Sequence, residues 1–435
     1  MDDAAANADA FALLALIRQL GVASSAQLQA ATGRSQPTLS RLLRALAAHV
    51  VVLGSGRSTR YGLPQPLLGA PAVQPLRWVM PDGRLHDWGR LTFLAGDRVH
   101  VQADGLDSLT QGGLPWFLAP LRAQGFLGRV LAQQWAQRGL DANPDRWSLE
   151  QVLATALLLH DAPGALVLGE PPAGNLVPPT TGAAPDLDAL ADEVAATLPA
   201  GSSAGGEQAK FLTQDETGHP LIVKFTPPLG TPFGDRWRDL LQAEALALQV
   251  LAEWGVPVAA AQVVQTARRA YLVSRRFDRL PGGGRLHAVP LDAVHAAFVP
   301  GGRQHWGATC RELERQRRLP PGAGAQAEAL LHFGRLIGNT DMHFGNLSLW
   351  VQPDDVPRGR FSGLAPVYDM LPMRWRPDMA QGLVDIEPFE PDAVALGSPA
   401  REVALQFWQR LAAVAEVSRP LRRTAQLMAL RLQRG

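Results

Sequence analysis

The chain has 435 residues, which is too long for one hydrophobic core of ordinary size and predicts two to four domains. Hydrophobic residues make up 46% and charged residues 19%, proportions that are typical of a globular protein and exclude wholesale disorder. A formal net charge of +1 excludes no class of partner until the charges are followed along the chain. The single cysteine, Cys310, excludes a disulfide scaffold and a cysteine-based zinc site, and it fits a reducing compartment.

Nothing in the sequence indicates a membrane protein. No apolar run reaches the roughly 18 residues that are needed to span a bilayer. The N-terminus carries Asp2, Asp3 and Asp9 in place of the basic segment of a signal peptide. We therefore expect a soluble cytoplasmic protein with no membrane partner.

The first seventy residues are basic and have the pattern of three short helices followed by a hairpin. Apolar residues at helical spacing over 13–20 predict a first helix. A capping box at Ser24–Gln27 opens a second helix, and Ser35 caps a third. Two strand-like runs, Val50–Leu53 and Thr59–Leu63, enclose a glycine-rich turn.

This order of elements resembles a winged helix-turn-helix, in which the third helix enters the DNA major groove and the wing contacts phosphates. No acidic residue occurs between Ala10 and Ala70, so six arginines remain uncompensated there. The charge favours double-stranded DNA as the partner over the alternative of a small helical module that binds proteins. The residues expected to contact DNA are polar or basic and lie on the third helix and the hairpin: Gln36, Thr38, Ser40, Arg41, Arg44, Arg57 and Arg60.

Residues 71–170 contain no constellation of ligand-forming side chains. Short strand-like runs alternate with turns, and two helical stretches follow at Gly125–Gln137 and Ser148–His160. Five prolines within Pro171–Pro185 indicate a linker or a long surface loop. A helix is expected to follow over Asp186–Leu198.

Lysine is rare in this chain, and its two copies lie close together. Lysine and arginine total 41, yet only Lys210 and Lys224 are lysines. Lys224 lies in a strand-like run that follows a loop of small residues, Gly201–Lys210. In a protein kinase, a glycine-rich loop covers the ATP phosphates and a lysine of the next strands supplies a positive charge to them. The loop residues expected to contact the nucleotide are Ser203, Ala204, Gly205, Gly206 and Gln208.

A second motif follows an apolar helix predicted over Ala325–Ile337. Asp341 and Asn346 have the separation of the base and the metal-binding amide in the kinase catalytic loop. Asp369 comes after a further strand and fits the second metal ligand. Together with Lys224, these residues predict phosphoryl transfer from ATP with Mg²⁺, in which the Asp341 carboxylate accepts or orients the proton of the attacked hydroxyl.

Two further segments suit the same fold. Glu244 lies on the predicted helix Arg236–Trp254, where it can pair with Lys224 or instead belong to a solvent-exposed face. The run 272–279 begins as a strand and then turns, as does the hinge between two kinase lobes. Adenine would be held there by backbone groups near Arg275 and Phe277.

These motifs together resemble the HipA-like serine/threonine kinases, which are the toxins of bacterial toxin–antitoxin systems. The motifs that carry the resemblance are the loop Ser203–Lys210, Val223–Phe225, Arg276–Arg279, Gly338–His343 with Asn346, and Tyr368–Asp369. The segment Gly113–Gly128 is similar to the N-terminal subdomain of the family, so the resemblance covers about residues 75–435. A winged helix fused to such a kinase is similar to the YjjJ-type branch of the family.

The resemblance implies further roles. Ser203 matches a serine whose autophosphorylation silences the kinase, with Ser202 as the alternative, and His343 of the catalytic-loop motif is expected to contact the nucleotide. Family substrates are aminoacyl-tRNA synthetases, and a fused DNA-binding domain implies autoregulation at the chain's own promoter. Two departures stand out: Gly345 replaces a lysine that the family often has, and Arg275 replaces a glutamate of the hinge motif.

The sequence therefore predicts an α+β multidomain protein. Its parts are a winged helix-turn-helix (1–70), a mixed α/β subdomain on the N-lobe side (71–170), a linker with the kinase N-lobe (171–280) and a mainly helical C-lobe (281–435), the last two forming a protein-kinase-like bilobal core. Two alternatives to a toxin kinase are a transcriptional regulator with a nucleotide-sensing, weakly active kinase domain and a small-molecule kinase. The sequence leaves open whether the chain is a homodimer and whether a separate antitoxin exists.

Overall fold

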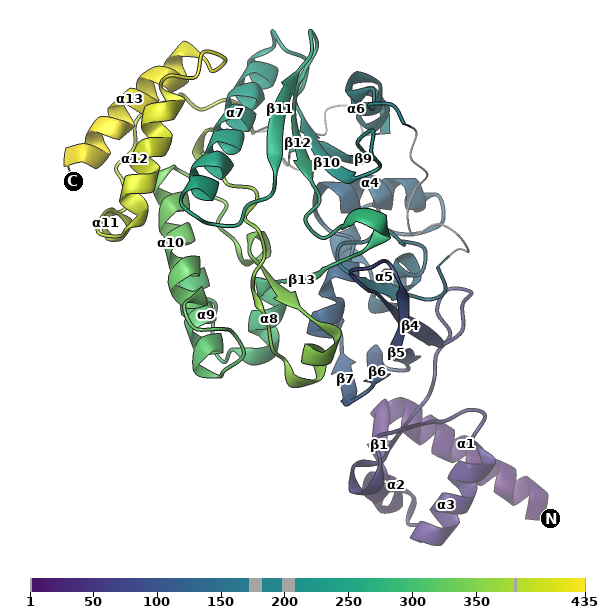
Figure 1. The fold of residues 1–435 in the computed structure, drawn as a ribbon. Helices are drawn as coiled ribbons and strands as arrows, with labels where there is room; N and C mark the ends of the chain where they lie inside the picture. The colour runs from purple at the N-terminus through teal and green to yellow at the C-terminus, as the bar shows by residue number, and fades with distance from the viewer. Residues whose placement is uncertain (1, 172–181, 198–207, 379–381, 435) are drawn as a thin grey trace.

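The computed structural model describes residues 2–171, 182–197, 208–378 and 382–434 of an α+β protein (Figure 1). Within these ranges the named strands form four sheets. The N-terminal module and the C-terminal helices lie at opposite ends of the molecule (Figure 1). None of the described helices is both long enough and apolar enough to cross a membrane.

The N-terminal module contains three α-helices, the 3₁₀ helix η1 (Gly56–Ser58) and a small antiparallel sheet with strand order β1-β3-β2. Its elements are α1 (Asp2–Leu20), β1 (Val22–Ser24), α2 (Ser25–Thr32), α3 (Gln36–Ala45), β2 (Val51–Leu53) and β3 (Arg60–Gly62). The capping box of α2 is present, with Ser24 and Gln27 bonded reciprocally. Ser35 is the N-cap residue of α3, but its side chain makes no capping hydrogen bond. Leu39 and Leu43, which lie four residues apart and so share one face of the helix, form the buried side of α3.

Backbone hydrogen bonds join this module to the next sheet. Ala95 N donates to Leu63 O at 2.8 Å, and Gln65 N donates to Phe93 O at 2.9 Å. Ala95 is also part of the buried core of the N-terminal module. The module therefore packs directly against the next sheet, in addition to being connected to it by the chain.

The middle domain is built on a five-stranded antiparallel sheet with strand order β7-β6-β5-β4-β8. Its elements are β4 (Val73–Val79), β5 (Leu85–Leu94), β6 (Arg98–Ala103), β7 (Leu106–Gln111), α4 (Gly125–Ala136), α5 (Leu149–Ala156), β8 (Leu166–Leu168) and the 3₁₀ helices η2 (Trp116–Leu121) and η3 (Pro144–Arg146). The helix expected over Ser148–His160 ends earlier, at Ala156, and the apolar stretch after Pro115 is a 3₁₀ turn. Pro120 lies inside that turn and lacks the N–H that an α-helix needs.

The four-stranded sheet of the N-lobe lies between helices α6 and α7. Its elements are α6 (Leu187–Thr197), β9 (Lys210–Gln214), β10 (Pro220–Phe225), α7 (Pro232–Glu253), β11 (Ala261–Gln265) and β12 (Ala270–Arg275), with strand order β11-β12-β10-β9. Val223 and Phe225 of β10 pack in one core with Ala191 of α6. Because side chains alternate along a strand, Lys224 points to the opposite face, toward α7.

The last segment of the chain, which the sequence predicts to be a C-lobe and which keeps that name below, is mainly helical. Its elements are β13 (His287–Pro290), α8 (Leu291–Phe298), α9 (Trp306–Arg315), α10 (Ala323–Leu336), β14 (Ser348–Val351), β15 (Gly363–Leu364), α11 (Ala393–Leu396), α12 (Ala400–Leu411) and α13 (Arg419–Arg434), with short 3₁₀ helices η5 (Pro281–Gly283), η6 (Phe344–Asn346), η7 (Pro353–Arg358) and η8 (Met373–Trp375). Trp408 of α12 is buried and donates from Nε1 to Leu336 O at 3.0 Å, which fixes α12 against the end of α10.

The middle domain contacts both lobes. Helix α4 touches α6 and β9 of the four-stranded sheet domain. The 3₁₀ helix η2 contacts β13 and α8 of the C-lobe, and the buried cores of the middle domain and the C-lobe are continuous. The sequence does not predict this contact with the C-lobe, because no local pattern in either segment indicates which distant segment it packs against.

Candidate active site

Lys224 stands at the centre of a buried group of charges. Its ammonium Nζ donates to both carboxylate oxygens of Glu244 on α7, at 2.6 and 2.7 Å, and to Asp369 Oδ1. The Lys224 side chain is 11% exposed and that of Glu244 is 2% exposed. Of the two environments that the sequence left open for Glu244, the structure has the ion pair and not the solvent-exposed face.

The charge states follow from these contacts. Burial by itself lowers the pKa of Lys224, but the carboxylates of Asp369 and Glu244 outweigh it and raise that pKa above its ordinary value. Burial raises the pKa of Glu244 against the pull of the lysine. Burial also acts to raise the pKa of Asp369, yet the Lys224 ammonium overcomes it and holds that pKa at about 2. Asp369 is therefore an ionised carboxylate at neutral pH.

The second lysine faces the same site. Lys210 of β9 is the direct register partner of Lys224 on β10, and paired residues of neighbouring strands project to one face of the sheet. The positive charge of Lys210 also favours the ionised form of Asp369. The sequence pointed to this residue only through the scarcity of lysine, and no contact residue was expected at this position.

The catalytic-loop residues lie directly after α10. The amide nitrogen of the Asn346 side chain donates to Asp341 O at 2.8 Å, which closes the loop on itself. The backbone N–H of Asp341 donates to Asn339 Oδ1 at 2.9 Å, and Asn339 Nδ2 donates to Asp369 O at 3.1 Å. Asn339 therefore connects the catalytic loop to the metal-ligand candidate. The sequence does not predict this role of Asn339, because no fixed residue spacing marks a buried amide that bridges two loops.

Asp369 and Asn346 suit a divalent cation that arrives with a nucleotide. Because Asn346 Nδ2 is bonded to a carbonyl, the amide oxygen is the end left to bind a cation. Asp369 has a φ of 53°, an uncommon conformation for a non-glycine residue and one that clusters at functional sites. Among the described residues, no three His, Cys, Asp or Glu side chains group as a self-contained metal site. Mg²⁺ needs only one or two protein carboxylates when phosphates supply further oxygens, so the residues fit this ion.

His343 occupies the space next to Gly345. The ring nitrogen Nδ1 of His343 accepts from Gly345 N at 3.0 Å, and its Nε2 lies 4.0 Å from Asp341 Oδ1. A Cβ atom on Gly345 would lie 2.9 Å from Cε1 of this ring. A side chain at position 345 would therefore collide with the His343 imidazole, unless the ring moved.

The hinge residues point in different directions. Phe277 stacks on Tyr368 with ring centroids 5.8 Å apart, and Tyr368 Oη donates to Gly345 O at 2.9 Å. The Arg275 side chain is exposed and pairs with Asp215 at 3.3 Å, away from the charges around Lys224. The expected role of the position 275 backbone in holding adenine stays a prediction.

The phosphate loop is only partly described. Ser202, Ser203, Ala204, Gly205 and Gly206 lie outside the described residues. Gln208 is described: its side-chain nitrogen donates to Phe225 O, and its Oε1 is buried. The structure thus places Gln208 against the end of β10, one residue past Lys224.

The residues expected to contact DNA lie on the surface of the N-terminal module. Most of them are exposed, namely Gln36, Ser40, Arg41, Arg44, Arg57 and Arg60. Thr38 is half-buried, and its hydroxyl lies 3.0 Å from that of Ser35. No described carboxylate pairs with any of the four arginines, whereas Arg34 pairs with Asp9 at 2.7 Å.

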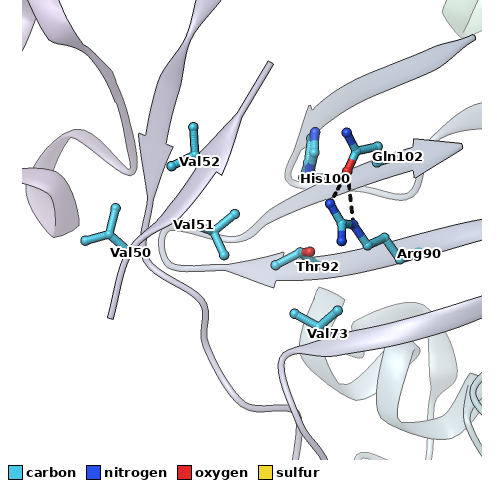
Figure 2. Close-up of a pocket in the computed structure, with 8 residues that line it drawn as sticks. All are labelled: Val50, Val51, Val52, Val73, Arg90, Thr92, His100 and Gln102. Atoms are coloured by element: carbon cyan, nitrogen blue, oxygen red, sulfur yellow. Dashed lines mark hydrogen bonds between the residues drawn. The ribbon is translucent and has the colours of Figure 1, made fainter. Parts of the chain in front are cut away.

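A cavity of about 240 Å³ lies at the junction between the N-terminal module and the middle sheet, separate from the residues around Lys224 (Figure 2). Figure 2 shows three valines of the N-terminal module on one side and polar residues of β5 and β6 on the other. Its lining residues are Val50, Val51, Val52, Val73, Arg90, Thr92, His100 and Gln102. Arg90 and Gln102 hydrogen-bond to each other across its polar wall.

Comparison with known proteins identifies the family. A family model described as the HipA-like C-terminal domain matches residues 202–431, and one described as the YjjJ-like toxin, middle domain, matches residues 70–176. Toxin YjjJ of Escherichia coli (strain K12) is 36% identical over 432 residues, and the match covers 94% of each chain. The chain belongs to the HipA-like family. Within that family it is similar to the YjjJ-like toxins. The family resemblance inferred from the motifs is thus confirmed.

One solved structure agrees with the HipA-like fold. A chain from the complex of the Shewanella oneidensis MR-1 toxin–antitoxin system, HipA, HipB and its operator DNA, matches with a TM-score of 0.53 and 16% identity. That match covers 83% of this chain and 97% of the other. The proinflammatory kinase CtkA of Helicobacter pylori matches with a TM-score of 0.34 and 12% identity over 54% of this chain and 90% of the other, which is too low to support a conclusion.

Proposed function

We propose that this HipA-like chain is a serine/threonine protein kinase that transfers the γ-phosphoryl group of ATP to a protein hydroxyl. The observation that carries the proposal is the buried Lys224–Glu244 pair, joined by Asp369 and placed beside the loop of Asp341 and Asn346. In protein kinases, a lysine–glutamate pair on these elements and a metal-binding aspartate must both be in place for phosphoryl transfer.

Each residue then has a defined task. Lys224 contacts the α- and β-phosphates, with Lys210 adding positive charge on the same face of the sheet. Asn346 and Asp369 hold Mg²⁺, which neutralises charge on the phosphates when it is bound. Asp341 accepts or orients the proton of the attacked hydroxyl, at the end of a loop that Asn339 and Asn346 keep in shape.

The remaining nucleotide contacts come from the phosphate loop, the hinge and the catalytic loop. The loop residues are Ser203, Ala204, Gly205, Gly206 and Gln208. The backbone at Arg275 and Phe277 holds adenine, and His343, whose Nε2 lies 4.0 Å from Asp341 Oδ1, contacts the nucleotide.

Family membership supports a toxin role. We propose that the substrate is a translation-related protein such as an aminoacyl-tRNA synthetase. Autophosphorylation at Ser203, or at Ser202 beside it, would silence the kinase. The E. coli relative is named a toxin, and the Shewanella HipA complex contains a partner protein, HipB, which supports a separate antitoxin as a further partner.

The N-terminal module is proposed to be a winged helix-turn-helix that binds the promoter of its own gene. The exposed residues of α3 would contact base edges, and Arg57 and Arg60 of the hairpin would contact phosphates. Uncompensated positive charge on this surface supports the assignment. The operator DNA in the solved Shewanella complex is consistent with DNA binding in the family.

The first test is intact mass after incubation with ATP and Mg²⁺. Wild type is expected to gain phosphate, Asp341→Asn to gain none, and Ser203→Ala to lose the modification or carry it at Ser202. Wild type that binds ATP, is purified unphosphorylated and still gains no phosphate would contradict the kinase assignment.

A second candidate function is a nucleotide-sensing transcriptional regulator with little kinase activity. It is favoured by Gly345, where no lysine supplies a charge and the His343 ring takes the adjacent space. This candidate predicts that ATP changes affinity for promoter DNA while neither the chain nor a protein substrate is phosphorylated. Equal DNA affinity with and without ATP would exclude it.

A further inference from the structure

Buried ions stabilise the hinge that follows β12. The guanidinium of Arg276 donates from Nε and Nη2 to the two carboxylate oxygens of Asp278, each at 3.0 Å. Arg279 Nη1 donates to Asp278 Oδ2 at 2.7 Å. These three side chains are between 4% and 10% exposed, so their charges depend on one another for solvation.

A second carboxylate of this cluster comes from another domain. Asp161 follows α5 of the middle domain, and its two oxygens accept from Arg276 Nη1 and Arg279 Nη2, each at 2.8 Å. Its side chain is 56% exposed. Asp161 thus joins the middle domain to both hinge arginines from the solvent side of the cluster.

The backbone around Asp161 reinforces this contact. Gly164 N donates to Asp278 Oδ2 at 2.9 Å, and Arg279 Nη2 donates to Ala162 O at 2.7 Å. Gly164 has a φ of 85°, and a Cβ atom there would lie 2.5 Å from a ring nitrogen of His287, so only glycine fits. The loop 160–165 is shaped to lie against the hinge and β13.

The hinge in turn contacts the active site. Phe277, between Arg276 and Asp278 in sequence, stacks on Tyr368. Tyr368 donates to the Gly345 carbonyl of the catalytic loop and directly precedes Asp369. A continuous series of contacts therefore runs from the middle domain through the hinge to the proposed metal ligand.

The charge balance makes Asp161 important. Arg285 is 2% exposed and donates to His160 O at 2.7 Å, so three buried or nearly buried arginines face only two carboxylates, Asp161 and Asp278. Loss of one carboxylate leaves guanidinium charge in a low-dielectric site, where an uncompensated ion is costly. The hinge is expected to shift in order to solvate that charge.

We propose that Asp161 is a positioning residue of the kinase: it holds the hinge through Arg276 and Arg279 and thereby fixes Phe277, Tyr368 and Asp369. The inference rests on the proposed kinase function only for its effect on phosphoryl transfer. Its structural part, coupling between the middle domain and the active site, is measured independently of that activity.

The test compares Asp161→Asn with Asp145→Asn in the full chain. Asp145 is exposed in the same domain, and its carboxylate pairs with no described side chain. Hydrogen exchange by mass spectrometry is expected to rise in Asp161→Asn over both 276–285 and 364–371, and the Kd for ATP is expected to rise about five- to tenfold. Asp145→Asn should match wild type in both.

Several outcomes would overturn the proposal. Faster exchange confined to 160–165 with an unchanged Kd for ATP would show a local structural role only. Asp161→Glu keeps the charge and should show smaller changes of the same sign; if Asp161→Asn fails to fold, unchanged exchange over 364–371 in Asp161→Glu overturns the proposal. If wild type binds ATP without transferring phosphate, the kinase proposal fails, and exchange and ATP binding still decide the role of Asp161.

Discussion

Arginine is used in two contrasting environments in this HipA-like chain. In the N-terminal module, Arg41, Arg44, Arg57 and Arg60 are exposed, and no described carboxylate pairs with them. Around the hinge, three arginines other than the exposed Arg275 are at most 5% exposed and belong to a network of carboxylates and backbone carbonyls: Arg276, Arg279 and Arg285. An exposed guanidinium that pairs with no carboxylate can bind an external phosphate. A buried guanidinium can bind only groups of the protein itself, and it stabilises the fold.

The two environments respond differently to change. Exposed charges are solvated by water, so removal of one alters a binding energy and leaves the fold intact. In the hinge cluster, burial lowers the pKa of Arg285 to about 10. Burial also opposes ionisation of Asp278, but Arg276 and Arg279 hold the pKa of that carboxyl at about 2. Stability there depends on each partner being present.

The largest expected effect is on the buried side of this comparison. Asp278→Asn leaves Arg276 and Arg279 with Asp161 as their remaining carboxylate, and we expect the free energy of unfolding to fall by about 3–5 kcal/mol. Urea denaturation at pH 7 measures this. The exposed Asp104→Asn serves as control and should change stability by less than about 0.5 kcal/mol. Equal stability of the two variants would contradict the buried network.

A pH dependence sharpens the same contrast. Burial lowers the pKa of His287 to about 4 from an ordinary value of 6.5, and this ring accepts from Ala165 N while contacting Phe117 O. Between pH 6.5 and 4 the unfolded chain takes up a proton that the folded chain excludes. The free energy of unfolding should therefore fall as the pH falls, by about 3 kcal/mol in total.

Denaturation at a series of pH values measures this slope. In His287→Gln that part of the slope should disappear, whereas the exposed His86→Gln should retain it. An unchanged slope in His287→Gln would assign the pH dependence to other groups.

At the active site the expected effect is of intermediate size and is seen in activity. Glu244→Gln removes the charge that pairs with Lys224 but keeps the size of the side chain. A hydrogen bond to a charged group contributes about 1.5–3 kcal/mol, so kcat/KM for ATP should fall about 10- to 100-fold. Phosphate transfer measured at several ATP concentrations tests this. Glu253→Gln, a surface change on the same helix, is the control, and equal rates in both variants would exclude a role for the pair.

The smallest effects are expected on the exposed side. Arg41→Ala should weaken binding to promoter DNA by about 1–3 kcal/mol if it contacts a base, and Arg57→Ala should reduce the salt dependence of binding by about one phosphate contact. Titration of labelled promoter DNA at several salt concentrations measures both. Arg360→Ala, an exposed arginine of the C-lobe, is the control. Unchanged DNA binding in the first two variants would overturn the DNA-binding assignment.

Much of the site was predictable because its signals are local. The separation of Asp341 and Asn346, the position of Lys224 in a strand and the capping box at Ser24 are all short-range patterns, and the structure has each of them on the expected element. The five-stranded middle sheet was less accessible, because the sequence shows only short strand-like runs between turns where the structure has β4 with 7 residues and β5 with 10.

The sequence by itself determined the order of the modules, the motif residues and the family, because helix caps, strand alternation and motif spacing are set within a few residues of chain. Only the tertiary structure decided that Glu244 faces Lys224, that Asn339 bridges two loops and that Asp161 pairs with the hinge. Each of these contacts joins residues that are distant in sequence. Their partners are selected by the packing of α7 on the N-lobe sheet and of the middle domain against the hinge, and no local pattern specifies that packing.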